Sequence, residues 1–325
     1  MNTLFALALS IAAPEVPVAL TEARTLINQG KPREALSKLE VLDPQDPHVG
    51  YLQGVAYYHA DDHVKAIEKL TPVVDKLIED KLEHQEAVQV LGLSLYLAGR
   101  LAESGPYLEQ TRAWAADNVQ LAYILGNAYL LTQKPAEGRA SFARLFGVPP
   151  ESAAAHLLAA QMMVRLELAE AADAELQQAI AKDPRIPQAH YLLGQAAIFR
   201  GQLDLARTLL EKELELSPGH AMALYRLGDA YTREARWDEA IVALQKSIWL
   251  SPYFSGPYIL LGKAYMKKGQ AATAEGMLRR ALEYDPNNKA AHYLLGQLLR
   301  QAGRMDEAQK ELAIAEKLQA EPERR

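Results

Sequence analysis

The stretch ALYRLGDAYTREARWDEAIVALQKSIWLSP, residues 223–252, contains two helical patterns separated by a short break. Leu224, Leu227 and Tyr231 recur at helical spacing on one face of the first half. A second amphipathic pattern follows and stops before Pro252, because the residue before a proline is biased away from helical angles. The stretch therefore predicts a helix–turn–helix unit in which each helix has an apolar stripe to bury.

The same pattern recurs along the chain with a period of 34 residues. A small residue keeps that interval strictly at Gly92, Gly126, Ala160, Gly194, Gly228, Gly262 and Gly296. Alanine stands twelve residues after five of these positions, and proline stands twenty-four residues after five of them. Neither helix of a unit can cover its apolar stripe alone, so neighbouring units are expected to stack.

Two earlier copies extend the array toward the N-terminus. Ala23 and Gly54 occupy the small position there, with a three-residue deletion near Leu42 and a four-residue insertion at 81–84. We therefore predict nine repeats in one continuous array over residues 16–322, with a short tail at 323–325. Their first helices are expected to begin near residues 16, 47, 85, 119, 153, 187, 221, 255 and 289.

The recurrent leucine, glycine, tyrosine, alanine and proline resemble the tetratricopeptide repeat (TPR), most closely over residues 224–252. The resemblance spans most of the chain and implies an all-α fold, a right-handed TPR superhelix (α-solenoid) of helix–turn–helix repeats. It also implies that the first helices line a concave groove, which in this family commonly holds a peptide or a partner segment. Pro106 departs from the pattern, and we place it in the first turn of a second helix, where proline is tolerated.

The composition argues against several classes of protein. The 325 residues include 35 Lys and Arg against 41 Asp and Glu, and the net charge of −6 argues against a nucleic-acid binder. The chain has no cysteine, which removes thiolate metal sites and a cysteine nucleophile. No phosphate-binding loop, nucleophile elbow or zinc-protease motif is present. We therefore predict no catalytic residue, no cofactor and no metal site.

Residues 1–13 have the character of an export signal. Leu4–Ala13 is an apolar run too short to span a bilayer, and it ends in small residues where signal peptides are cleaved. We predict a periplasmic or secreted protein without a membrane-spanning helix. The alternatives are an apolar first helix and a cytoplasmic location. N-terminal sequencing of the protein from its native cells separates them, because an intact Met1 contradicts export.

Two copies of AHYLLGQ place a histidine four residues before the small position, at His190 and His292. A histidine in a fixed frame raises the question of a metal ligand or a catalytic base. Other repeats place Leu224 and Tyr258 in this slot, which is typical of a residue packed between helices. We interpret the histidines as packing residues, with a polar role on the helix ridge and metal binding as the alternatives.

The stretch YYHADDHVKA contains two histidines and two aspartates, His59, Asp61, Asp62 and His63. Imidazoles and carboxylates together could bind a divalent transition metal. The aspartates fall in the turn between two helices, where aspartate commonly caps the second helix. We therefore interpret them as caps, and we interpret the acidic pairs at 238–239 and 306–307 in the same way.

Three columns of the repeat face the groove if the TPR resemblance holds, at three and two residues before the small position and one residue after it. Tyrosines, aliphatic residues and amides fill these columns, which suits an apolar or extended partner segment. The alternative is that the superhelix buries this wall against itself. The predicted partner-binding residues are Tyr123, Asn127, Leu158, Gln161, Tyr191, Leu192, Gln195, Tyr225, Arg226, Asp229, Lys263, Tyr293 and Gln297.

Taken with the resemblance, these patterns favour a non-enzymatic protein–protein interaction scaffold that binds a protein or peptide segment. Envelope assembly or secretion is the expected setting if the leader is cleaved. The alternative is a regulatory or accessory subunit of a cytoplasmic enzyme complex. Self-association is left open, because the last repeat has no dedicated capping helix.

Overall fold

A computed structural model describes residues 16–77 and 81–320 of the chain. The described residues form eighteen α-helices and one 3-10 helix, with no β-strand among them, so the predicted all-α fold is confirmed. No helix in these ranges is both long and apolar enough to cross a bilayer. The predicted export signal at 1–13 and the tail at 323–325 lie outside the described residues.

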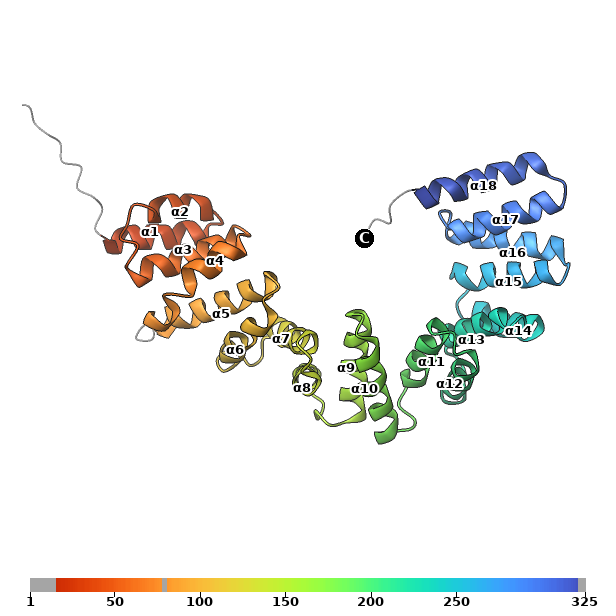
Figure 1. The fold of residues 1–325 in the computed structure, drawn as a ribbon, viewed down its shortest axis with the longest axis horizontal. Helices are drawn as coiled ribbons and strands as arrows, with labels where there is room; N and C mark the ends of the chain where they lie inside the picture. Colours follow the sequence, from red (N-terminus) through yellow and green to blue (C-terminus); the bar gives the residue numbers. More distant parts are fainter. Residues whose placement is uncertain (1–15, 78–80, 321–325) are drawn as a thin grey trace, which may run out of the picture. The chain divides into compact units, whose positions relative to one another are not determined.

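The helices alternate as the first and second members of successive repeats (Figure 1). The first helices are α1 (Val16–Asn28), α3 (Pro47–His59), α5 (Lys81–Leu97), α7 (Val119–Leu131), α9 (Ala153–Arg165), α11 (Ala189–Phe199), α13 (Ala221–Arg233), α15 (Ser255–Lys267) and α17 (Lys289–Gln301). The second helices are α2 (Pro32–Leu39), α4 (His63–Leu70), α6 (Leu101–Arg112), α8 (Pro135–Leu145), α10 (Ala169–Lys182), α12 (Leu203–Leu216), α14 (Trp237–Leu250), α16 (Ala271–Tyr284) and α18 (Met305–Ala320). The 3-10 helix η1 (Val74–Leu77) follows α4.

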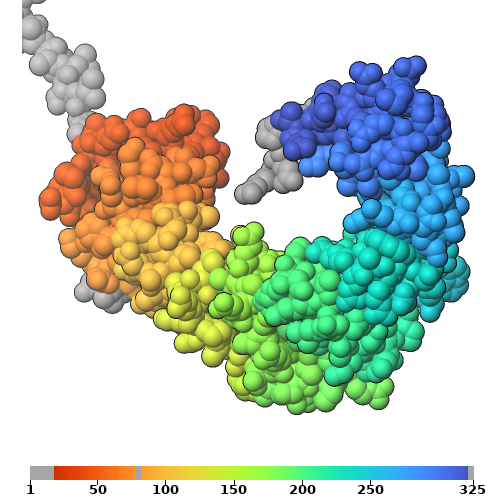
Figure 2. Space-filling model, turned by 45° about the vertical axis from the view of Figure 1, so that its right-hand side comes forward, coloured from red at the N-terminus to blue at the C-terminus, as the bar shows by residue number. Residues whose placement is uncertain are grey.

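The helices belong to two compact units, one ending at Glu167 and the other beginning at Leu168. In the first unit α1 to α8 form four helix pairs, and α9 packs on α8. In the second unit α10 packs on α11, and α11 to α18 form four further pairs. Within each unit the colours of Figure 2 follow one another in sequence order, as expected when each repeat packs on its neighbours. The sequence predicts one array, and the structure divides it between the two helices of the fifth repeat.

The recurrent small residue makes room for a large side chain sixteen positions later, on the second helix of the same repeat. A Cβ atom built at any of these glycines would lie no more than 3.0 Å from that side chain. The pairs are Gly54 with Leu70, Gly92 with Leu108, Gly126 with Phe142, Gly194 with Leu210, Gly228 with Leu244, Gly262 with Leu278, and Gly296 with Leu312. The glycine period therefore sets how closely the two helices of a repeat approach.

Each repeat also turns back through a residue with left-handed backbone angles, seven positions after the small residue. Five of these nine residues are glycines, at Gly30, Gly99, Gly201, Gly269 and Gly303, and the others are Asp61, Gln133, Glu167 and Ala235. Glycine adopts a positive φ at little cost because it has no Cβ. Ala235, with a φ of 58°, is the least suited because it has a Cβ and no polar group to compensate.

We expect Ala235→Gly to raise the free energy of unfolding by about 0.5–1 kcal/mol, because glycine relieves the left-handed strain. Gly201→Ala provides the reverse change at the same position of the previous repeat, where no atom would touch the new Cβ. That control should lose about 1 kcal/mol through backbone strain alone. Urea unfolding followed by circular dichroism measures both, and an Ala235→Gly protein no more stable than wild type would contradict the expectation.

The four-residue insertion at 81–84 adds about one helical turn to α5, which begins at Lys81 rather than near residue 85. Glu83 lies 2.5 Å from Nδ1 of His48, and Nδ1 of His84 lies 2.9 Å from the carbonyl oxygen of Val74. An insertion of about 3.6 residues keeps the packed face of a helix in register, so the repeat tolerates it.

Pro106 lies deeper in its helix than predicted. It is the sixth residue of α6, beyond the first turn, and the helix continues to Arg112. The prediction that Pro106 lies in the first turn is therefore wrong. A proline inside a helix removes one main-chain hydrogen bond, and α6 retains its course through packing on its neighbours.

The helix α11 begins at Ala189 rather than near residue 187, because a buried carboxylate from α12 holds its N-terminus. The N–H groups of Gln188 and Tyr191 donate to the two oxygens of Glu213, at 2.9 and 3.3 Å. Nδ1 of His220 lies 3.2 Å from the same carboxylate, whose residue is fully buried. Anionic groups are favourable at a helix N-terminus, where main-chain N–H groups have no partner within the helix.

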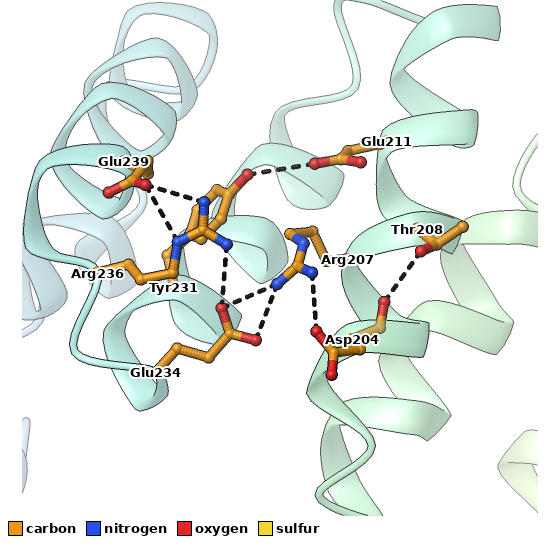
Figure 3. A network of polar contacts seen from close by, with 8 residues as sticks. All are labelled: Asp204, Arg207, Thr208, Glu211, Tyr231, Glu234, Arg236 and Glu239. Atoms are coloured by element: carbon orange, nitrogen blue, oxygen red, sulfur yellow. Dashed lines mark hydrogen bonds and ion pairs between the residues drawn. The ribbon is translucent and has the colours of Figure 1, made fainter.

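Ion pairs connect neighbouring repeats at their turns, as Figure 3 shows for the sixth and seventh. Arg207 of α12 donates to both oxygens of Glu234 at 3.0 Å, and Glu234 follows α13. Arg236, the N-cap residue of α14, donates to Glu239 at 2.9 Å. The acidic pair at 238–239 lies in the first turn of α14, where negative charge suits the helix dipole, while Arg236 and not an aspartate is the N-cap residue. The pair at 306–307 likewise lies in the first turn of α18, and Glu307 forms an ion pair with Arg304, which precedes the helix.

Candidate functional site

The buried histidine slot is a packing position that also makes polar contacts, and Nδ1 of His292 lies 2.6 Å from a carboxylate oxygen of Glu311. His190 and His292 are 6% and 8% exposed, which confirms the packing interpretation. Nε2 of His292 lies 2.9 Å from the carbonyl oxygen of Pro286, and the Tyr258 hydroxyl donates to Pro252 at the same distance. In both repeats, the side chain in the slot is therefore the hydrogen-bond partner of a proline carbonyl oxygen. That proline follows the second helix of the preceding repeat.

The histidine–aspartate stretch in the first unit is a helix cap. The Asp62 carboxylate accepts a hydrogen bond from the main-chain N–H of Lys65 at 3.1 Å, as the capping interpretation predicts. Asp61 is the left-handed residue of its turn. Over residues 16–77 and 81–320, no three His, Asp or Glu side chains are arranged to hold a metal ion.

Four of the predicted partner-binding residues lie in the first unit, where the columns differ in exposure. Tyr123 is 41% exposed, Leu158 and Gln161 are half-buried, and Asn127 is only 5% exposed. Asn127 therefore contributes little surface to a partner.

Tyr51 shows that the tyrosine column of the repeat is not always a surface. It stands three residues before Gly54, yet it is fully buried. Its hydroxyl donates to Glu86 at 2.6 Å, and Arg24 donates to the same carboxylate. Burial acts to raise the pKa of Glu86, but the hydrogen bonds from Arg24 and Tyr51 bring that pKa below its ordinary value. The tyrosine is thus part of a polar core network in the first unit.

The other nine predicted residues lie in the second unit, on consecutive first helices that contact one another. We call them the first-helix face: Tyr191, Leu192, Gln195, Tyr225, Arg226, Asp229, Lys263, Tyr293 and Gln297. Tyr293 is 50% exposed and the remaining eight are half-buried. The structure thus brings residues from four repeats onto neighbouring helices with part of each side chain accessible.

Aromatic contacts hold two tyrosines of this face in place. The ring centroid of Tyr191 lies 4.7 Å from that of His220, and the centroid of Tyr225 lies 5.0 Å from that of Phe254. His220 and Phe254 are the N-cap residues of α13 and α15, so each tyrosine contacts the start of the next first helix. Gly256 leaves space for the second pair, because a Cβ there would lie 2.7 Å from Phe254.

Arg226 is the most distinctive residue of the face. Its guanidinium carbon lies 5.8 Å from the ring centroid of Phe199 and 5.3 Å from that of Tyr225. Its Nε atom is buried without a hydrogen-bond partner, and the described residues offer it no ion pair. Asp229, one turn away, is already bonded to Arg233 at 3.1 Å. The guanidinium therefore lies close to two rings and forms no ion pair with the described residues.

Lys263 of α15 adds a second positive charge to the face and likewise forms no ion pair with the part of the chain that is described.

The sequence patterns missed three residues that shape this site, namely Phe199, His220 and Phe254. The last two occupy the same position, 34 residues apart, immediately before a first helix. Adding the position before each first helix to the groove columns would have identified His220 and Phe254.

The comparisons with known proteins agree with this architecture. A tetratricopeptide repeat model matches residues 251–324, and a second one matches residues 20–71, 163–220 and 191–248. Together the matches cover more than half of the chain. The chain belongs to the tetratricopeptide repeat family. No curated protein matches this TPR chain.

Several solved TPR structures are similar to parts of the chain. A MamA structure from Desulfovibrio magneticus RS-1 is 24% identical, covers 51% of this chain and 94% of its own, and has a TM-score of 0.47. YrrB, described as a TPR protein with an unusual peptide-binding site, is 20% identical over 57% of this chain and 93% of its own, with a TM-score of 0.47. The anaphase-promoting complex assembly Cut9–Hcn1 is 18% identical over 88% of this chain and 56% of the other, with the same TM-score.

Proposed function

We propose that this TPR protein is a binding scaffold whose first-helix face holds an extended segment of a partner protein. The observation that carries the proposal is Arg226, a cation close to the rings of Phe199 and Tyr225 that forms no ion pair with the described residues. The cell envelope is the proposed setting, because residues 1–13 have the character of an export signal.

The chemistry of the face points to an anionic, partly apolar partner segment. An arginine restrained by flanking rings loses little side-chain freedom on binding, and its planar donors match a carboxylate. Lys263 extends the positive charge to the next first helix, while Leu192 and Tyr191 offer apolar contact on the previous one. A segment that alternates acidic and aliphatic side chains would satisfy both kinds of residue.

We expect Arg226→Glu to weaken the binding of such a segment by about tenfold or more, because the reversed charge repels a carboxylate in a partly desolvated site. Arg226 is a cleaner target than Tyr191 or Tyr225, whose rings also contact the next repeat. The probes are labelled synthetic peptides that alternate leucine with glutamate or leucine with lysine, measured by fluorescence anisotropy.

The control variant is Lys310→Glu, which makes the same charge change at an exposed position of α18. Wild type and the control should both prefer the acidic peptide. Equal binding of the acidic and basic peptides by wild type would contradict the proposal, as would equal losses for Arg226→Glu and Lys310→Glu.

A further inference from the structure

The outward face of α14 carries exposed side chains that the first-helix face does not use. Six residues at helical spacing form it, and we call them the α14 outer face: Asp238, Glu239, Val242, Gln245, Lys246 and Trp249. Val242 is 54% exposed and Trp249 is 83% exposed. Trp249 lies on the same face of α14 as Val242, two helical turns away. An exposed tryptophan beside an exposed valine is typical of a protein–protein interface.

A cleft of about 520 Å³ opens beside this face, between α12 and α14. Its floor is apolar, with Leu214 from α12, Leu224 and Leu227 from α13, and Val242 on the rim. Tyr231 closes one end, where Arg236 lies 4.7 Å from the ring centroid and Glu211 accepts the hydroxyl at 3.2 Å (Figure 3). The wall at this end is therefore held by a polar network and is formed before any partner arrives.

The charges of the face are arranged symmetrically about Val242. Asp238 precedes it by four residues and Lys246 follows it by four, so one helical turn separates each charge from the valine. Asp238 is exposed and forms an ion pair with Lys268, the C-cap residue of α15, while Lys246 forms no ion pair with the described residues. A helix with acid at one end and base at the other is complementary to a copy of itself in the antiparallel direction.

We propose that two copies of this chain associate through their α14 outer faces, antiparallel and related by a two-fold axis near Val242. Asp238 of each copy then lies opposite Lys246 of the other. Trp249 of each copy packs along the N-terminal half of the other α14, where the apolar cleft opens. An isologous contact of this kind closes as a dimer, because each surface is used once by its own copy.

The dimer is expected to be weak and to depend on protein concentration. One helix face and the adjoining cleft bury less than the roughly 800 Å² per partner of a standard interface. Sedimentation equilibrium of the full chain over a series of concentrations should show a reversible monomer–dimer equilibrium. A wild-type chain that remains monomeric throughout the series overturns the proposal.

Trp249→Ala should raise the dissociation constant of the dimer by about tenfold or more, as expected for a tryptophan buried in an interface. Its exposure means that the fold does not depend on it. Trp114→Ala, which removes a 38% exposed tryptophan in the first unit, is the matched control. A dimer that both variants weaken equally, or that neither weakens, contradicts the α14 interface.

A charge exchange tests the antiparallel arrangement directly. Lys246→Glu leaves only acidic charges on the face and Asp238→Lys leaves mainly basic ones, so each variant alone should be monomeric. Their equimolar mixture should recover a one-to-one dimer, because both opposing pairs are again of opposite sign. A mixture that stays monomeric while circular dichroism shows folded protein overturns the arrangement.

This interface is independent of the proposed partner site, because α14 is a second helix and the first-helix face is not part of it. Arg226→Glu should therefore leave the dimer unchanged while it weakens binding of the acidic peptide. Lys246→Glu should do the opposite. Dimerisation and peptide binding therefore test the two proposals separately, and one can fail while the other holds.

Discussion

Leucine in place of Gly228 is expected to lower the free energy of unfolding by about 3 kcal/mol, the upper part of the range for overpacking a core. A Cβ at this position would already lie 2.5 Å from Cγ and 2.6 Å from Cδ2 of Leu244. Leu244 is fully buried between α13 and α14, so it has no free space to enter. The helices of the seventh repeat must separate, and the neighbouring repeats lose contacts with them.

The matched control is Gly276→Leu in the middle of α16, where no atom lies within 4 Å of the added Cβ. Leucine there should raise the stability slightly, because glycine is the poorer helix former by about 0.8 kcal/mol. Thermal and urea unfolding of the two variants measure the difference. If Gly228→Leu and Gly276→Leu unfolded alike, the close approach of α13 and α14 would be wrong.

Removing the carboxylate of Glu213 is the second large change. Glu213→Ala is expected to lower the free energy of unfolding by about 3 kcal/mol, because the N–H groups of Gln188 and Tyr191 lose their acceptor. Alanine itself fits the position, since Ala281 occupies it two repeats later. Glu215→Ala, at an exposed position of the same helix, should change the stability little.

The effect of Glu213 should also depend on pH. Burial acts to raise the pKa of this carboxyl, but hydrogen bonds from His220, Gln188 and Tyr191 bring the pKa below its ordinary value of 4.5. A folded pKa below the unfolded one stabilises the protein above the unfolded pKa, and this stabilisation is lost as the pH falls through the folded pKa. The gap in unfolding free energy between wild type and Glu213→Ala should thus be largest near neutral pH and shrink below about pH 4.5. A gap that stays constant or widens in acid would show that the carboxylate does not act as an anionic cap.

Much of the fold could be predicted because the period of 34 is imposed by local geometry. The turn at Ala235 and the break at Pro252 act within a few residues of their own position, and the small residue at Gly228 acts within its own repeat. The cap at Asp62 is also a local feature, because the first main-chain N–H groups of a helix that follows a turn need an acceptor. The buried histidines were predictable by comparison with Tyr258, since a slot filled by different large residues indicates packing.

The candidate site was predictable only as columns of residues. Tyr51 and Tyr191 stand in the same column, yet one is buried against Glu86 and the other is half-buried on the first-helix face. The difference arises because Glu86, on the next first helix, supplies a carboxylate acceptor that the second unit lacks at that position. A column identifies the side of a helix, but the residues across from it decide whether the side remains accessible.

By itself, the sequence determined the repeat, the alternation of first and second helices and the register of the small residue, because each follows from short-range steric rules repeated along the chain. Only the tertiary structure decided the late start of α11, the division at Glu167 and the ring environment of Arg226. Those features depend on side chains from other helices, such as Glu213 for α11 and Phe199 for Arg226. Contacts between repeats depend on which side chains meet in space, and the period along the chain does not by itself identify them.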